Sequence, residues 1–211
     1  MSIEENIAFK RIDNILDYVR EGIKSGNLTV DEVAKFARIY ARQGIPGEEV
    51  ITKMKNNLEE TKNIVTIDKI TGEPGWIVTN PDGEEYIIQD STFKKKYEID
   101  TENPKKYKPR GVPVLSTVIE ENIEFIASWG ETMKISAGGS LIISTPNDIY
   151  GIQEAEFKNT YASTGKAPTE CLKEALSLFE ISKEEFLQAR ERKTQETYYN
   201  AKKTDDDAPG L

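Results

Sequence analysis

The sequence predicts an α+β protein, in which helical ends flank a central part made of two related β-hairpin–helix modules with short antiparallel strands. Two observations lead to this class. Apolar residues have helical spacing over residues 1–62, alternate as in strands over residues 63–166, and have helical spacing again over residues 167–203. A segment at Pro74–Tyr97 also returns in altered form at Gly138–Tyr161.

Residues 1–62 are expected to form an N-terminal helical unit. A first amphipathic helix is predicted over residues 4–24, and Thr29 with Glu32 has the spacing of a capping box for a second, which ends at Gly44. A third helix is predicted from Pro46 to Lys62. The apolar faces of these helices either form a common core or leave a groove for a partner helix.

Residues 63–109 are expected to form the first module and a basic linker. Strands are predicted at Ile64–Ile70 and Trp76–Thr79, followed by a hairpin turn at "NPDGE" and the returning strand "YIIQ". A short helix should follow, capped by Asp90 or Ser91. Its Phe93 and Tyr97 are four residues apart and therefore share one face.

Residues 110–166 repeat this plan in diverged form. Strands are predicted at 123–127 and 132–135, then a turn at "AGGS", a hairpin from "LIIST" through "PND" to "YGIQ", and a helix at "EAEFKNTY". Aligned from Tyr86 and Tyr150, twelve positions contain six identities, whereas random pairing gives about one. Two such modules can pack about a pseudo-twofold axis and leave a groove between equivalent surfaces.

The C-terminal part is expected to be helical over residues 167–203. Pro168 is suited to a helix start, and Ser182 with Glu185 has the spacing of a second capping box. From Arg190 the pattern is mostly polar, which fits either a protruding helix that pairs with another subunit or a fraying end. Residues 204–211 are expected to form a disordered acidic tail.

Composition argues against most catalytic chemistry. The 211-residue chain has no histidine and one cysteine, Cys171, which excludes a Ser-His-Asp triad, histidine-ligated zinc and an intramolecular disulfide. The net charge of −9 argues against general nucleic-acid binding, and neither a secretory signal nor a membrane span is recognisable. We therefore expect a cytoplasmic protein that is not an enzyme, with no catalytic residues, no cofactor and no metal.

One segment has the opposite charge to the rest of the chain. Lys94–Arg110 contains seven bases and three acids, and Tyr97 and Tyr107 lie among them. Such a cluster can hold phosphate while a tyrosine face stacks on a base, although it also fits a solvated helix end and linker. Trp76 and Trp129 are core residues unless one of them lines an open cleft. The candidate ligand-binding residues are Lys94, Tyr97, Lys105, Lys106, Tyr107, Lys108, Arg110, Trp76 and Trp129.

The repeated segment resembles the small phage and bacterial proteins grouped as PGDYG-type domains. The resemblance covers "PGWIVTNPDGEEYIIQDSTFKKKYE" and a diverged second copy at Trp129–Tyr161, but "PGWI" and "AGGS" replace the eponymous residues. Its motifs are turn and core residues, so the resemblance implies a fold rather than a chemistry. It also implies a phage-type accessory protein, located in the host cytoplasm if a phage encodes it.

The expected function is non-catalytic binding. The first hypothesis is an accessory factor, for example an anti-defence factor, that captures a small anionic, nucleotide-like ligand with the bases of Lys94–Arg110. The first alternative is a protein–protein interaction or adaptor module for a host or phage protein, with a possible homo-oligomer. The second alternative is a hydrolase that uses a carboxylate-bound metal.

Overall fold

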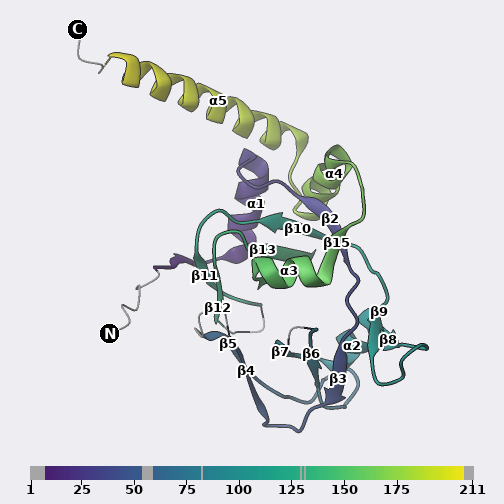
Figure 1. Ribbon diagram of the computed structural model, residues 1–211. Helices are drawn as coiled ribbons and strands as arrows, with labels where there is room; N and C mark the ends of the chain where they lie inside the picture. Colours follow the sequence, from purple (N-terminus) through teal and green to yellow (C-terminus); the bar gives the residue numbers. More distant parts are fainter. Residues whose placement is uncertain (1–7, 54–58, 82, 129, 131, 207–211) are drawn as a thin grey trace.

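The computed structural model describes residues 8–53, 59–81, 83–128, 130 and 132–206, and it has a mixed α+β fold (Figure 1). Its helices are α1 (Ile15–Ser25), α2 (Asp90–Lys96), α3 (Glu154–Thr160), α4 (Pro168–Leu178) and α5 (Lys183–Asp206). Its strands are β1 (Lys10–Ile12), β2 (Asp31–Lys35), β3 (Tyr40–Gln43), β4 (Glu49–Lys53), β5 (Glu59–Ile64), β6 (Trp76–Thr79), β7 (Glu85–Ile88), β8 (Tyr97–Ile99), β9 (Tyr107–Pro109), β10 (Val114–Val118), β11 (Ile123–Ile126), β12 (Thr132–Ile135), β13 (Ser140–Thr145), β14 (Asp148–Ile152) and β15 (Tyr161–Ser163).

The strands form several small sheets. The largest has the strand order β14-β13-β10-β2-β15, and a second has the order β3-β6-β7. The ribbon β8-β9 continues this second sheet through an isolated bridge between Ile39 and Tyr107. The hairpin β4-β5 and the sheet β1-β11-β12 make up the remainder, and β5 lies beside β12 (Figure 1).

The predicted N-terminal helical unit is wrong except for the second half of its first helix, because Lys10–Ile12 of that predicted helix form the strand β1. The helix α1 is present, and Asn14 caps it by accepting from the amides of Leu16 and Asp17. The second and third predicted helices are instead the strands β2 to β5, although residues 54–58 of the third lie outside the described residues. Residues 1–62 are therefore no separate unit, since β2 pairs with β10 and β15 while β3 pairs with β6.

Tertiary pairing explains this correction. Val33 and Ala37 are buried as one face of a helix would require, but Phe36 and Tyr40 of that predicted face are exposed, and the buried Ile39 does not belong to it. Strand pairing on both sides of β2 outweighs the weak helical preference of these residues. Glu32 does not cap a helix; its carboxylate accepts from Lys166 Nζ at 2.6 Å and from the Thr164 hydroxyl at 2.8 Å.

The two predicted hairpins are present, and both have the same register. Each is followed by a seven-residue helix and a three-residue strand, α2 with β8 and α3 with β15. In the first hairpin Trp76 pairs with Ile88 and Val78 with Tyr86. At the equivalent positions of the second hairpin, Ser140 pairs with Ile152 and Ile142 with Tyr150. Gly83 has a φ of 91°, which supplies the left-handed residue that the first turn requires. The predicted strand at 64–70 differs, because β5 ends at Ile64.

The start of α2 differs from the expected cap. Its N-cap residue is Gln89, which makes no side-chain capping bond, and Asp90 is the first helical residue. The Asp90 carboxylate instead accepts from Trp76 Nε1 at 2.8 Å and from Lys94 Nζ at 2.7 Å. Asp90 therefore links α2 to the strand β6 through Trp76 and does not cap the helix.

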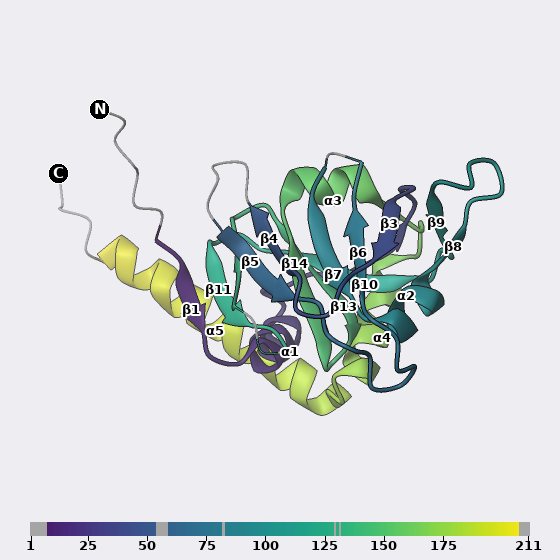
Figure 2. The ribbon, with the colours of Figure 1, turned by 90° about the horizontal axis from the view of Figure 1, so that it is seen from below.

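The C-terminal helices begin where the sequence predicts. Pro168 is the first residue of α4, and Ser182 and Glu185 form a reciprocal capping box at the start of α5. The helix α5 leaves the body of the molecule and extends through residues 204–206 of the predicted tail, whereas 207–211 lie outside the described residues (Figures 1 and 2). Among the described residues, no helix has both the length and the apolar character needed to cross a membrane.

Candidate functional site

The β8-β9 ribbon, the start of the following loop and Arg38, which pairs with acids of the ribbon turn, form a surface that we call the cationic corner. It contains the bases Arg38, Lys105, Lys106, Lys108 and Arg110 and the acids Glu98, Asp100 and Glu102. The corner lies far from the free end of α5 (Figure 2). Five bases against three acids leave a local charge of +2, in a protein whose net charge is −9.

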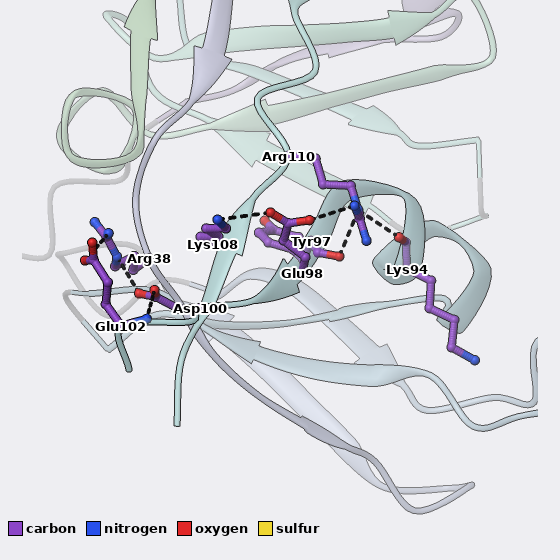
Figure 3. A network of polar contacts seen from close by, with 8 residues as sticks. All are labelled: Arg38, Lys94, Tyr97, Glu98, Asp100, Glu102, Lys108 and Arg110. Carbon is purple, nitrogen blue, oxygen red and sulfur yellow. Dashed lines mark hydrogen bonds and ion pairs between the residues drawn. The ribbon is translucent and has the colours of Figure 1, made fainter. Parts of the chain in front are cut away.

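Arg110 is the most firmly held base of the corner. Its Nε donates to the backbone carbonyls of Lys94 and Tyr97 at 3.3 and 3.2 Å, and its Nη1 donates to Glu98 at 2.8 Å (Figure 3). Its Nη2 has no hydrogen-bond partner among the described residues, and 46% of its side chain is exposed. The chain thus positions one guanidinium and leaves donors available at the surface.

Glu98 is shared by two bases. One carboxylate oxygen lies 2.8 Å from Arg110 Nη1 and the other lies 3.2 Å from Lys108 Nζ (Figure 3). All three side chains are between 38% and 46% exposed, so solvent screens these ion pairs. Strand pairing places them together, because Glu98 lies directly opposite Lys108 in the β8-β9 register.

A second ion-pair group fixes the turn of the ribbon. Arg38 Nε donates to the buried Asp100 carboxylate at 2.5 Å, and its Nη2 donates to Glu102 at 3.1 Å. Asp100 also accepts from the Glu102 amide, which together with Arg38 holds the pKa of Asp100 below its usual range. Asp100 in turn raises the pKa of Arg38. These contacts stabilise the turn of the ribbon.

The predicted lysines are not all brought together. Lys94 points away from the corner and pairs with Asp90, while the Lys106 ammonium lies 4.9 Å from the centre of the Tyr40 ring. Lys105 is exposed at the turn, where its amide donates to Asn103. The corner therefore presents Lys105, Lys106, Lys108 and Arg110 but not Lys94.

The predicted aromatic residues pack against one another and do not present open ring faces for a ligand. Trp76 stacks on Phe93 at 4.2 Å between ring centres, and Tyr107 meets both rings edge-on. Tyr97 stacks on Phe93 from another side and is only 4% exposed. The expectation that a Tyr97 face stacks on a base is therefore corrected, because Tyr97 belongs to the buried core, whereas Tyr107 is partly buried against it. Trp129 lies outside the described residues.

The sequence did not predict a second polar cluster, in which Lys35 meets tyrosines of both hairpin–helix segments. The Lys35 ammonium donates to the Tyr86 hydroxyl at 2.8 Å and to the Asn80 side-chain oxygen at 3.2 Å. It lies 5.2 to 5.9 Å from the ring centres of Tyr86, Tyr97 and Tyr161. Burial lowers the pKa of Lys35 to about 8, although Glu156 and Glu84 act in the opposite direction.

Lys35 lies beside two equivalent tyrosine pairs and contacts Tyr86, Tyr97 and Tyr161 of them. The hydroxyls of Tyr86 and Tyr97 are 3.2 Å apart, and those of Tyr150 and Tyr161 are 2.8 Å apart. Burial raises the pKa of all four, that of Tyr161 to about 12. The identities Tyr86/Tyr150 and Tyr97/Tyr161 were the sequence signal for these pairs, but nothing near Lys35 indicated that it joins them. We call these four tyrosines and Lys35 the tyrosine–lysine cluster.

Other parts of the surface are weaker candidates for a binding site. A polar crevice of about 470 Å³ lies between α1 and α5, and no predicted site residue lines it. Within the described ranges, no three Cys, Asp or Glu side chains gather in a way that could hold a metal ion. Comparison with protein-family models, with curated proteins and with solved structures found no match, so the resemblance to PGDYG-type domains stays a prediction.

Proposed function

We propose that this protein is a non-catalytic binding protein that captures a phosphate-bearing small molecule at the cationic corner. The observation that carries the proposal is Arg110, a half-exposed guanidinium that two backbone carbonyls and Glu98 hold in place. A base that is already positioned loses little conformational entropy when an anion binds. Lys105, Lys106 and Lys108 lie on the same ribbon and add positive charge.

The proposed ligand is recognised by its charge rather than by stacking. The tyrosine rings near the corner are engaged in the core cluster, so a nucleotide would be held through its phosphates. Guanidinium and ammonium donors bind phosphate oxygens through charge-assisted hydrogen bonds. A phage-type accessory role, as implied by the PGDYG resemblance, would suit a protein that captures a phosphorylated host molecule.

A charge-reversal experiment tests this proposal. The variant Lys105→Glu/Lys106→Glu/Arg110→Glu is expected to bind ATP at least about tenfold more weakly than the wild type in calorimetry, since one lost charge-assisted bond is worth about that much. Raising NaCl from 50 to 300 mM should weaken wild-type binding as well.

The matched control is Lys158→Glu/Lys173→Glu/Lys183→Glu, which makes the same change in net charge at exposed residues outside the corner. It should keep most of the wild-type affinity. Equal losses in both triple variants would mean that net charge alone governs binding. Wild-type affinity in the corner variant would overturn the proposal.

We also propose that the chain is an internal duplication whose halves exchange strands. The strand β2 pairs with β15, and the chain then enters β3, which pairs with β6. In the same way β9 pairs with β8, and the chain then enters β10, which pairs with β13. The two sheets therefore correspond strand for strand, in the orders β7-β6-β3-β9-β8 and β14-β13-β10-β2-β15. The tyrosine–lysine cluster lies between the two halves.

A second candidate function is protein–protein binding near the hairpin β4-β5. Isoleucines are exposed in and around this hairpin, and the side chain of Ile70 is the most exposed of them at 79%. The others are Ile45, Ile51, Ile64 and Ile67. Ile51 and Ile64 lie on one face of this hairpin, since Ile64 pairs with Glu49, and exposed apolar surface of this kind is typical of interaction sites.

A further inference from the structure

The cationic corner already holds an anion of its own, the carboxylate of Glu98. We propose that Glu98 is a built-in competitor, which occupies the anion position between Lys108 and Arg110 and lowers the affinity of the corner until a ligand displaces it. This inference rests on the proposed function and adds how the same site is regulated. The geometry is that of a bound ligand, because each carboxylate oxygen takes one base (Figure 3).

Displacement of Glu98 is sterically simple. The side chain is 38% exposed and extends from the short ribbon β8-β9, so it can rotate into solvent without moving the core. The backbone pairing of Glu98 with Lys108 and the bonds from Arg110 Nε to two carbonyls do not involve the carboxylate. Arg110 therefore stays positioned when Glu98 leaves.

The competitor also selects among ligands. An incoming group must replace two ion pairs, one to Lys108 and one to Arg110. A single carboxylate on the ligand would only exchange one carboxylate for another. A group with adjacent phosphates brings more charge and more acceptor oxygens, and it can use Arg110 Nη2 as well. The proposed ligand class is therefore a diphosphate or a nucleotide with two or more phosphates, rather than a monocarboxylate.

Glu98→Gln tests this inference, because it keeps the size of the side chain and removes its charge. With inorganic pyrophosphate as the probe at 50 mM NaCl, the variant is expected to bind about fivefold more tightly than the wild type in calorimetry, since breaking two exposed ion pairs costs about that much. The matched control is Glu121→Gln, which makes the same charge change at a 45% exposed ion-pair partner of Lys10 that lies outside the corner. It should change the affinity less than twofold.

The outcomes separate the two proposals. If the wild type binds pyrophosphate and Glu98→Gln binds it no more tightly, the competitor role is wrong while the proposed function stands. Equal gains in Glu98→Gln and Glu121→Gln would mean that net charge, and not the position of Glu98, sets the affinity, which also overturns the inference. If neither the wild type nor Glu98→Gln binds pyrophosphate or ATP, both proposals fail.

Discussion

Replacing Trp76 by alanine is expected to lower the free energy of unfolding by about 3 kcal/mol, the lower end of the usual cost of removing a large aromatic side chain, because Trp76 is only partly buried against the core. Two losses contribute. The indole leaves its stack with Phe93, and the buried Asp90 carboxylate loses the hydrogen bond from Trp76 Nε1. Urea unfolding followed by circular dichroism measures the change.

Tyr107→Phe is the matched control for this prediction. It keeps the ring that meets Trp76 and Phe93 and removes only a hydroxyl, so the free energy of unfolding should change by no more than about 0.5 kcal/mol. A Trp76→Ala protein as stable as the wild type would mean that Trp76 is not a core residue. It would return Trp76 to the list of candidate ligand contacts.

Lys35→Met is expected to remove a rise in stability that the wild type shows as the pH increases from about 8 to 10.5. Burial lowers the pKa of Lys35 to about 8, against 10.5 for an ordinary lysine. Between these values the unfolded state binds more protons than the folded state, so the free energy of unfolding increases with pH. The full shift is worth up to about 3 kcal/mol.

The measurement is the difference in Tm between the wild type and Lys35→Met at several pH values from 7 to 10.5. Taking the difference cancels the common effect of the tyrosines, which destabilise the fold once they ionise in the unfolded chain above about pH 10. Relative to the variant, the wild type should gain several degrees across the window. A difference that stays constant with pH would show that Lys35 is solvated in the folded protein.

Local patterns in the sequence predicted the hairpins, the short helices and the capping box of α5, because each depends on neighbouring residues. The turn at Gly83 and the pair Ser182/Glu185 are examples in which the sequence carries the whole signal. The strands β2 to β5 could not be predicted in this way. The conformation of β2 and β3 depends on pairing with β6, β10 and β15, which are distant in sequence, whereas β4 and β5 pair with each other.

The sequence predicted the candidate site as a cluster of charge, but it did not predict how the basic side chains are placed. The surplus of bases over Lys94–Arg110 was visible in the sequence. The sequence did not show which of those bases face the corner, since the direction of each side chain depends on which acid lies across the ribbon or along the helix. Lys108 and Arg110 meet at Glu98, whereas Lys94 turns to Asp90 one helical turn away.

The most direct test of anion capture is native mass spectrometry of the purified protein, after mixing with a small-molecule extract of the cells that produce it. We expect a discrete added mass of a phosphorylated compound on the wild type and on the Lys158/Lys173/Lys183 control, but none on the Lys105/Lys106/Arg110 variant. The same added mass on the corner variant, or a bare mass for all three proteins, would contradict capture at the cationic corner.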